Sequence, residues 1–235
     1  MQMKTFDVYD NANQAVQEAY AMLTTNILIN DSPEMYKTFA LTSCNPEEGK
    51  TSLAISLAIM LAQSGGKVLL VDADMRKPTA AKRLNKGSVF GLSDYLAEKV
   101  DLNDVLSETN ITNFTYCACG NDHRNPIGLL YSSRFEELVN KVENEYDIVL
   151  FDTPALSSVA DGAIVASKVD ATLLVVKMGL TTLTSLKRIK EQLEKLNVNI
   201  LGVVLNKVKK HDYTRYFGSY NYFFNSKRFF NNKNT

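Results

Sequence analysis

The sequence predicts an α/β fold, in which a mostly parallel central sheet is covered by helices on both faces. Apolar runs of strand length alternate with segments of helical length along most of the chain, and this alternation is typical of parallel sheets buried on both sides. Several of the apolar runs end in an acid or an amide, as expected where ligands gather at one edge of such a sheet. The 235 residues, 45% of them hydrophobic, suffice for one sizeable core.

The first half of the chain holds the clearest elements. A helix is expected over 13–29, where apolar side chains recur near one face. The apolar run over 38–42 predicts a buried strand, and the apolar segment over 51–63 predicts a buried helix that ends at Gly65-Gly66, as in a left-handed cap. A second buried strand over 67–72 ends in Asp72.

The later elements continue the same alternation. Further strands are expected over 114–117, 148–152, 171–177 and 200–205, and further helices over 93–98, 132–145, 160–167 and 184–196. Pro154 stops the strand over 148–152 because proline cannot donate to a ladder. We therefore expect a folded domain over 1–206, followed by a flexible tail over 207–235 in which no strand or helix period fits.

The loop between the first strand and the second helix carries the strongest functional signal. Residues 45–52 read Asn-Pro-Glu-Glu-Gly-Lys-Thr-Ser, and a strand, a Gly-Lys-Thr loop and a helix together place backbone N–H groups and a positive helix end around a polyphosphate. Lys50 can reach the β- and γ-phosphates, and the Thr51 hydroxyl can bind Mg²⁺. The predicted nucleotide-binding residues here are Glu48, Gly49, Lys50, Thr51 and Ser52. Cys44 stands where the usual pattern has its first glycine, so a plain strand-to-helix turn is the alternative.

Acidic residues end two further strands. Asp72 and Asp74 lie two positions apart, so both can point to one side of an extended segment. Asp152 ends the strand over 148–152, where a carboxylate can hold Mg²⁺. Each acid alone is explained by a polar strand end. Together with the phosphate loop they predict metal coordination and general-base chemistry at one site.

These segments resemble the bacterial tyrosine kinases, the cytoplasmic P-loop kinases that regulate capsule and exopolysaccharide synthesis. The resemblance runs from about Glu18 to the end of the chain. Lys50-Thr51-Ser52 is similar to the family's Walker A segment, Asp72 and Asp74 to its Walker A′ segment, and Asp152 to its Walker B segment. An Asn-Pro…Ser segment of the family is matched by Asn125-Pro126 and Ser133. The resemblance implies a P-loop NTPase fold with a deviant Walker A loop.

The resemblance also implies the ligands and the roles of the site residues. ATP and Mg²⁺ are the expected ligands, and the reaction is phosphoryl transfer to a tyrosine hydroxyl. Lys50 holds the phosphates, and Asp72 accepts the tyrosine proton with support from Asp74. The catalytic set is Lys50, Asp72, Asp74 and Asp152, and the metal set is Thr51, Asp72 and Asp152. Asn206 matches a strand-end asparagine that borders the nucleotide base in related P-loop ATPases.

Three departures from the family pattern stand out. Glu47 replaces a glycine, which removes backbone freedom. It also adds a charge that costs roughly 3 kcal/mol at about 6 Å from a phosphate charge, unless the side chain faces solvent. Ala21 and Thr24 replace two arginines that serve ring assembly in the family. Gly128 replaces a glutamate after Asn125-Pro126.

The tail over 207–235 differs from the rest of the chain. Its lysines and arginines outnumber its one acid, Asp212, for a side-chain charge near +6. Three interpretations compete: packing back onto the domain, contact with nucleic acid or a membrane, and autophosphorylation. Four phosphotyrosines would add roughly −6 to −8 charges and reverse the local charge. Given the phosphate loop we favour autophosphorylation in trans, at Tyr213, Tyr216, Tyr220 and Tyr222.

The composition of the chain indicates which partners and which cellular location to expect. The formal net charge is zero, so no nucleic-acid partner is expected. No apolar run reaches the ~20 residues that span a bilayer, and the amino end lacks the apolar core of a signal peptide. We expect a cytoplasmic protein that binds ATP and ADP and forms a ring or trans dimer. The resemblance implies recruitment to the membrane by the cytoplasmic segment of a separate membrane activator.

Two other functions stay open at this stage. A Min/Par-type P-loop ATPase shares the predicted fold, but its signature lysine early in the loop is Asn45 here. A non-catalytic nucleotide-binding regulator of polysaccharide machinery, or a weakened kinase, would fit Glu47. ATP hydrolysis without phosphotyrosine would indicate the first, and nucleotide binding without turnover the second.

Overall fold

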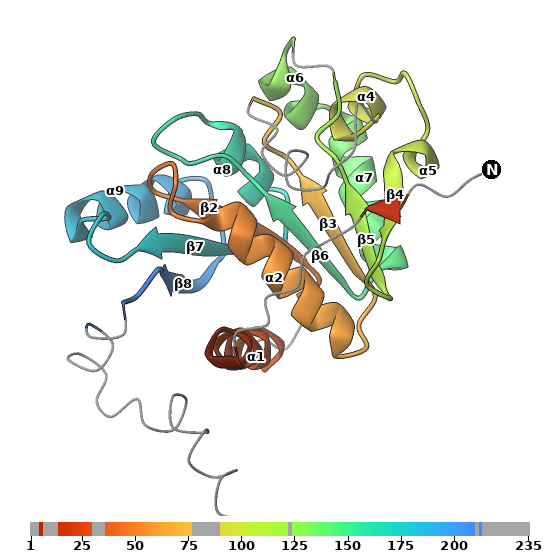
Figure 1. The fold of residues 1–235 in the computed structure, drawn as a ribbon. Coiled ribbons are helices and arrows are strands. Elements are labelled where there is room, and N and C mark those ends of the chain that lie inside the picture. The colour runs from red at the N-terminus through yellow and green to blue at the C-terminus, as the bar shows by residue number, and fades with distance from the viewer. Residues whose placement is uncertain are drawn as a thin grey trace, which may run out of the picture.

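The computed structural model describes residues 5–6, 14–29, 36–76, 90–121, 124–209 and 212, which fold around one central sheet (Figure 1). The strands are β1 (Thr5–Phe6), β2 (Thr38–Ser43), β3 (Val68–Asp72), β4 (Leu106–Thr109), β5 (Phe114–Cys117), β6 (Ile148–Asp152), β7 (Ala171–Lys177) and β8 (Ile200–Asn206). The helices are α1 (Gln14–Leu28), α2 (Lys50–Gln63), α4 (Leu92–Leu96), α5 (Leu102–Val105), α6 (Pro126–Tyr131), α7 (Ser133–Glu145), α8 (Asp161–Ala166) and α9 (Leu183–Glu194).

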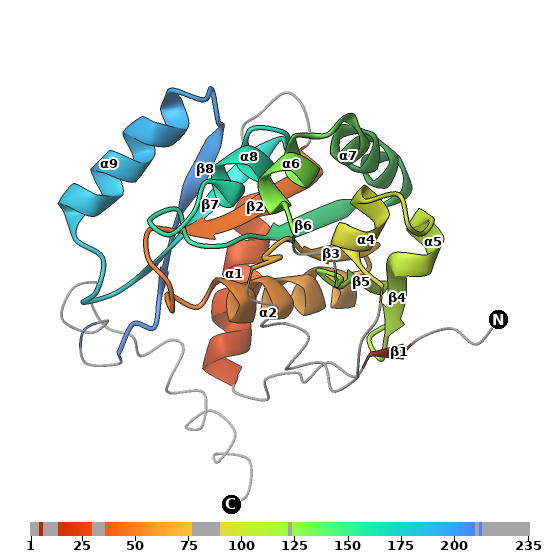
Figure 2. The same ribbon diagram turned by 90° about the horizontal axis from the view of Figure 1, so that it is seen from above.

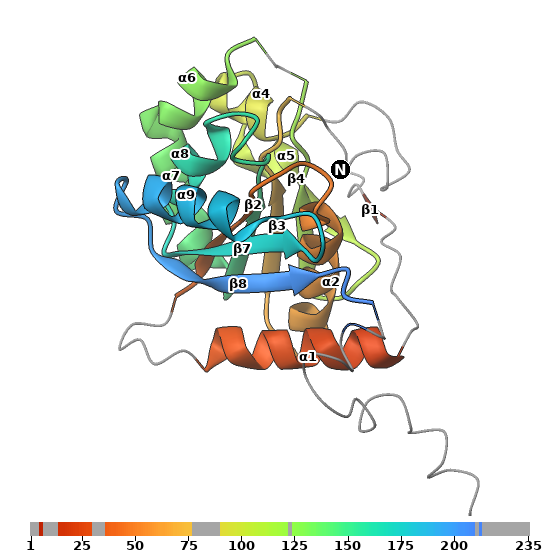
Figure 3. The same cartoon turned by 90° about the vertical axis from the view of Figure 1, so that its left-hand side faces the viewer.

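The sheet formed by the described residues has the order β1-β4-β5-β3-β6-β2-β7-β8. Its strand pairs are parallel except for β4 with β5, which is antiparallel. β2 lies inside the sheet between β6 and β7, whereas β8 lies at one edge, as Figure 3 shows. The prediction of a mostly parallel α/β sheet is confirmed.

Helices cover both faces of the sheet, so its strands are apolar throughout. Figure 2 shows α7, α8 and α9 on one face and α1 and α2 on the other. In β3, Leu69 and Val71 belong to the core under α7, α8 and α9. Val68 and Leu70 belong to the core under α2. Successive side chains of a strand point to opposite faces, which explains why all five residues of β3 are buried.

The parallel strands bring their carboxyl ends to one edge, where the predicted site residues lie. β2 leads into the Gly-Lys-Thr loop, β3 ends at Asp72, β6 at Asp152 and β8 at Asn206. Asp72 lies directly opposite Asp152 in the β3–β6 register. Asp152 in turn lies opposite Leu41 of β2. Residues far apart in sequence therefore meet beside the loop.

The six predicted strands and six predicted helices are present, and each of their ends lies within two residues of the expected position. The short elements β1, α5, β4 and α6 were not predicted. The four tail tyrosines, Tyr213, Tyr216, Tyr220 and Tyr222, lie outside the described residues. Among the described helices, none has the length and apolar character needed to cross a bilayer.

Candidate active site

A cavity of about 520 Å³ opens beside the loop that follows β2. Ligand pockets commonly have volumes of ~300–1,000 Å³. Its lining comes from four segments of the chain. These are the loop with the start of α2, the segment after β3, the segment after β6, and Lys207 directly after β8. The lining residues are Pro46, Glu47, Gly49, Lys50, Thr51, Ser52, Asp74, Arg76, Pro154, Ala155, Ser158, Val159 and Lys207.

The loop turns sharply at Gly49, so that α2 begins at Lys50. Gly49 has φ 95°, a left-handed conformation that a residue with a side chain rarely adopts. An added Cβ atom there would lie 2.4 Å from Nδ2 of Asn206. Gly49 is therefore required twice, by its backbone conformation and by its neighbour. The turn aims the positive end of α2 at the cavity.

The Lys50 ammonium lies at the centre of this turn. Its Nζ donates to Oγ of Ser43 at 2.9 Å, and that hydroxyl donates to the carbonyl of Asn45 at 2.7 Å. Burial lowers the pKa of Lys50, and Asp152, Asp74 and Glu48 oppose the shift in that order. Lys50 thus lies in an acidic surrounding while lining the cavity.

Glu48 supports the loop from inside. Its side chain is fully buried and accepts from the backbone N–H of Asn45 at 2.9 Å. It also accepts from the Thr181 hydroxyl, which belongs to the connection between β7 and α9. These contacts give the Glu48 carboxylate a positioning role in the loop. A direct nucleotide contact by this residue stays a prediction.

Glu47 stands where the family has a glycine, and its backbone adopts the left-handed conformation that favours glycine. Its φ is 62°, and its side chain is exposed. The exposure meets the condition set by the sequence, that this carboxylate face solvent. The left-handed backbone costs about 1–2 kcal/mol in a residue with a Cβ atom.

Asp72 and Asp152 form a buried pair of acids at the ends of β3 and β6. Their exposed fractions are 1% and 3%. Burial, and next the neighbouring Asp152, raise the pKa of Asp72 well above its ordinary value. The N–H of Asp74 and the hydroxyl of Tyr116, which donate to Asp72 at 3.1 and 3.4 Å, oppose the shift. The two carboxyl groups repel each other when both are ionised, and the neighbouring Lys50 ammonium offsets part of that repulsion.

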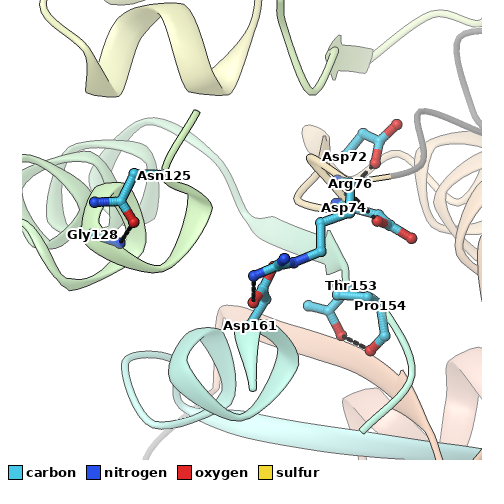
Figure 4. Close-up of polar contacts among 8 residues, drawn as sticks. All are labelled: Asp72, Asp74, Arg76, Asn125, Gly128, Thr153, Pro154 and Asp161. Carbon is cyan, nitrogen blue, oxygen red and sulfur yellow. Dashed lines mark hydrogen bonds and ion pairs between the residues drawn. The ribbon is translucent and has the colours of Figure 1, made fainter. Parts of the chain in front are cut away.

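Asp74 and Arg76 follow β3 at the rim of the cavity (Figure 4). Arg76 reaches across to Asp161 at the start of α8, and donates to both carboxylate oxygens at 2.8 and 3.1 Å. Asp161 is fully buried. The two residues lie 85 positions apart in the chain, so no local pattern predicts this pairing.

Asn206 and Lys207 bring the end of β8 to the loop. Nδ2 of Asn206 donates to the carbonyl of Glu48 at 2.9 Å. Nζ of Lys207 donates to the carbonyl of Glu47 at 3.0 Å. The proximity of Asn206 to the loop agrees with its predicted place in the site, and its contact with a nucleotide base stays a prediction.

The structure also brings in residues that sequence reasoning missed, namely Ser43, Tyr116 and Thr181. Ser43 is the last residue of β2, one position beyond the predicted strand, and Tyr116 lies in β5, which was predicted only as a strand. Thr181 lies 133 residues from Glu48, a separation that no local pattern reveals. The only available signal was for Ser43, a polar residue at a strand end next to the loop.

A strand, a Gly-Lys-Thr turn and a helix, with two acids at neighbouring strand ends, define this chain as a P-loop nucleotide-binding protein. Comparison with known proteins agrees, since residues 37–202 match the family model described as AAA domain. Tyrosine-protein kinase CpsD of Streptococcus agalactiae is 34% identical over 195 residues, 83% of this chain and 84% of that protein. The chain belongs to the bacterial tyrosine-protein kinase family.

Other relatives place the chain in the same family. The putative tyrosine-protein kinase CapB of Staphylococcus aureus is 31% identical over 90% of this chain and 94% of its own. The kinase domain of the Escherichia coli tyrosine kinase ETK superposes with a TM-score of 0.79 at 34% identity, covering 83% of this chain and 76% of that one. The resemblance drawn from the motifs and the predicted P-loop fold are both confirmed.

Proposed function

We propose that this chain is an ATP-dependent protein-tyrosine kinase that phosphorylates its own carboxyl-terminal tyrosines in trans and regulates capsule or exopolysaccharide synthesis. The observation that carries the proposal is the Lys50 turn lying beside the buried Asp72–Asp152 pair. Family membership with named tyrosine-protein kinases supports the same activity. The septum site-determining protein MinD of Pyrococcus horikoshii superposes with a TM-score of 0.63 at 22% identity, covering 75% of this chain and 73% of that one, and this likeness supports the fold alone.

The residues present fit a magnesium ion carried with the nucleotide. No group of three or more His, Cys, Asp or Glu side chains suited to a metal occurs in the described part of the chain. Mg²⁺ in phosphoryl-transfer sites is usually held by one or two carboxylates together with substrate phosphates. Thr51 lines the cavity, and the Asp72–Asp152 repulsion would be relieved by a cation. Such an ion supplies charge stabilisation to the transferring phosphoryl group.

Each protein group then has a defined task in the transfer. Lys50 and the loop amides hold the phosphates, while Thr51 and Asp152 hold the metal. The tyrosine oxygen forms a bond to the γ-phosphorus, the bond from that phosphorus to the β,γ-bridging oxygen breaks, and ADP leaves. Asp72 accepts the tyrosine proton. Because burial raises the pKa of Asp72, its carboxylate is a stronger base than an exposed aspartate.

Partners follow from the same proposal. Phosphorylation in trans requires two copies of the chain, as a ring or a dimer. In α1, Ala21 and Thr24 stand where the family has arginines. Ala21 is exposed, whereas Thr24 is buried. The solved chimerical protein CapA2B2 resembles this chain with a TM-score of 0.78 at 29% identity. We propose a separate membrane activator that recruits this cytoplasmic chain to the membrane.

Substitution of Lys50 tests the proposal. Lys50→Met is expected to abolish tyrosine phosphorylation with the fold retained, while Lys187→Met, at an exposed position of α9, is expected to behave as wild type. Mass spectrometry of the tail after incubation with Mg·ATP measures phosphotyrosine, and circular dichroism checks the fold. Undiminished phosphotyrosine in Lys50→Met would refute the site assignment.

A further inference from the structure

Lys207 joins the root of the tail to the phosphate loop. It is the first residue after β8, and its Nζ donates to the carbonyl of Glu47 at 3.0 Å. Its side chain also covers the loop, since a Cβ atom added at Gly49 would lie 3.4 Å from Cε of Lys207. The ammonium of Lys207 therefore contacts the turn that precedes α2, and its stem lies next to Gly49.

Both partners of this hydrogen bond have a strained backbone. Glu47 has φ 62° and Lys207 has φ 55°, and neither is a glycine. Left-handed conformations of such residues persist only where surrounding contacts hold them. The Lys207–Glu47 hydrogen bond, together with that from Asn206 to the Glu48 carbonyl at 2.9 Å, supplies those contacts. The end of β8 thus stabilises the conformation of the loop.

Lys207 also contributes charge to the cavity. Three cationic side chains line it, Lys50, Arg76 and Lys207, against two anionic ones, Glu47 and Asp74. Arg76 is already paired with Asp161. An ammonium group can donate three hydrogen bonds, so Lys207 can hold the Glu47 carbonyl and still face an anion in the cavity.

We propose that Lys207 is a positioning residue of the nucleotide site, which holds the loop ready for phosphate and makes nucleotide affinity depend on the root of the tail. The proposal rests on the proposed nucleotide site. Because coupling between two binding events is reciprocal, bound nucleotide would also stabilise the position from which the tail leaves the domain. Tail and loop are then linked within one copy of the chain.

Binding of Mg·ADP to four variants of the full chain, measured by calorimetry, tests the proposal. Loss of one charged hydrogen bond predicts that Lys207→Met binds about three- to tenfold more weakly than wild type. Lys207→Arg, which keeps a donor, is expected to stay within twofold. The matched control Lys209→Met removes the same charge two residues further on, at an exposed position, and is expected to bind as wild type. Lys50→Met is expected to lose binding.

The variants separate the two proposals. If Lys207→Met binds within twofold of wild type, or if Lys209→Met weakens binding equally, Lys207 does not position the loop. If Lys50→Met also binds as wild type, the nucleotide site itself is wrong. Thermal unfolding of each variant without nucleotide identifies a loss of folding.

A double substitution tests the strained backbone itself, with Glu47→Gln as the reference background that removes the same charge and keeps the Cβ atom. Glycine adopts the left-handed conformation without the cost that Glu47 incurs, so the loop of a Glu47→Gly chain should depend less on Lys207. Lys207→Met is therefore expected to weaken Mg·ADP binding less in the Glu47→Gly background than in the Glu47→Gln background. Equal losses in both backgrounds would contradict the role of Lys207 in holding the strained loop.

Discussion

Asp72 is a carboxyl group placed where its ionised form is unfavourable. Burial and the neighbouring Asp152 both raise its pKa, so the ionised side chain destabilises the folded protein. The stability present below the ordinary pKa is lost as the pH rises through the folded pKa. A residue proposed to act as a base thus weakens the nucleotide-free fold at neutral pH, as is common for catalytic groups.

Asp72→Asn is therefore expected to stabilise the nucleotide-free protein, increasingly so as the pH rises. Each kcal/mol gained at this size raises Tm by about 2–4 °C. Thermal unfolding from pH 4 to pH 8 measures the effect, with Glu137→Gln at an exposed position of α7 as control. An equal Tm for Asp72→Asn and wild type throughout that range would contradict the raised pKa.

Glu47 adds a negative charge at the rim of the cavity. Since the side chain is exposed, solvent and salt screen its repulsion of phosphate. Glu47→Gln should tighten Mg·ADP binding by about two- to fivefold at low salt. Calorimetry at two salt concentrations tests this, because the gain should shrink as salt is added. A gain that does not depend on salt would show that charge is not the cause.

At the scale of elements, the Arg76–Asp161 pair ties the segment after β3 to α8. The side chain of Arg76 is 38% exposed, whereas that of Asp161 is fully buried. Removal of the Arg76 guanidinium therefore leaves the buried Asp161 carboxylate without its two donors. Arg76→Met should lower the free energy of unfolding by about 1–2 kcal/mol, a value reduced for the exposure of the arginine. Urea denaturation measures this free energy.

The control Arg188→Met, at an exposed position of α9, should change the free energy of unfolding by less than about 0.5 kcal/mol. An equal effect of the two substitutions would refute the pairing of Arg76 with Asp161.

The elements that sequence predicted and those that it missed differ in what forms them. β2, β3 and β6 are apolar runs buried on both faces, so composition alone identifies them. β4 reads Leu-Ser-Glu-Thr, which is too short and too polar to form an apolar run, and it is identified by its antiparallel pairing with β5. β1 has only two residues. α6 did carry a local signal, since Asn125 caps it and Pro126 is its first residue.

The residues of the candidate site also differ in how far the sequence alone predicts them. Gly49, Lys50 and Thr51 were predictable because the motif is contiguous, and Asp72 and Asp152 because each ends an apolar strand. The contacts of Glu48 with Thr181, of Arg76 with Asp161 and of Lys207 with Glu47 join distant parts of the chain. Only the folded sheet brings these residues together.

At the scale of the whole molecule, transfer in trans makes a prediction about mixed chains. A Lys50→Met chain with an intact tail, mixed with a Lys50 chain whose four tail tyrosines are changed to phenylalanine, should acquire phosphotyrosine from Mg·ATP. Phosphate on the Lys50→Met chain then comes from its partner. Mass spectrometry reads the product, and absence of phosphotyrosine from this mixture, when the unchanged chain is phosphorylated, would contradict transfer between copies.

Because β8 comes late in the sequence, its contacts with the proposed nucleotide loop form late in synthesis of the chain. The hydrogen bonds from Asn206 and Lys207 to the loop span 158 and 160 residues. Chains fold from the amino end as they leave the ribosome, so the Gly-Lys-Thr turn emerges long before the residues that hold it. A growing chain therefore completes the contacts of the proposed nucleotide loop only after β8 and Lys207 have been translated.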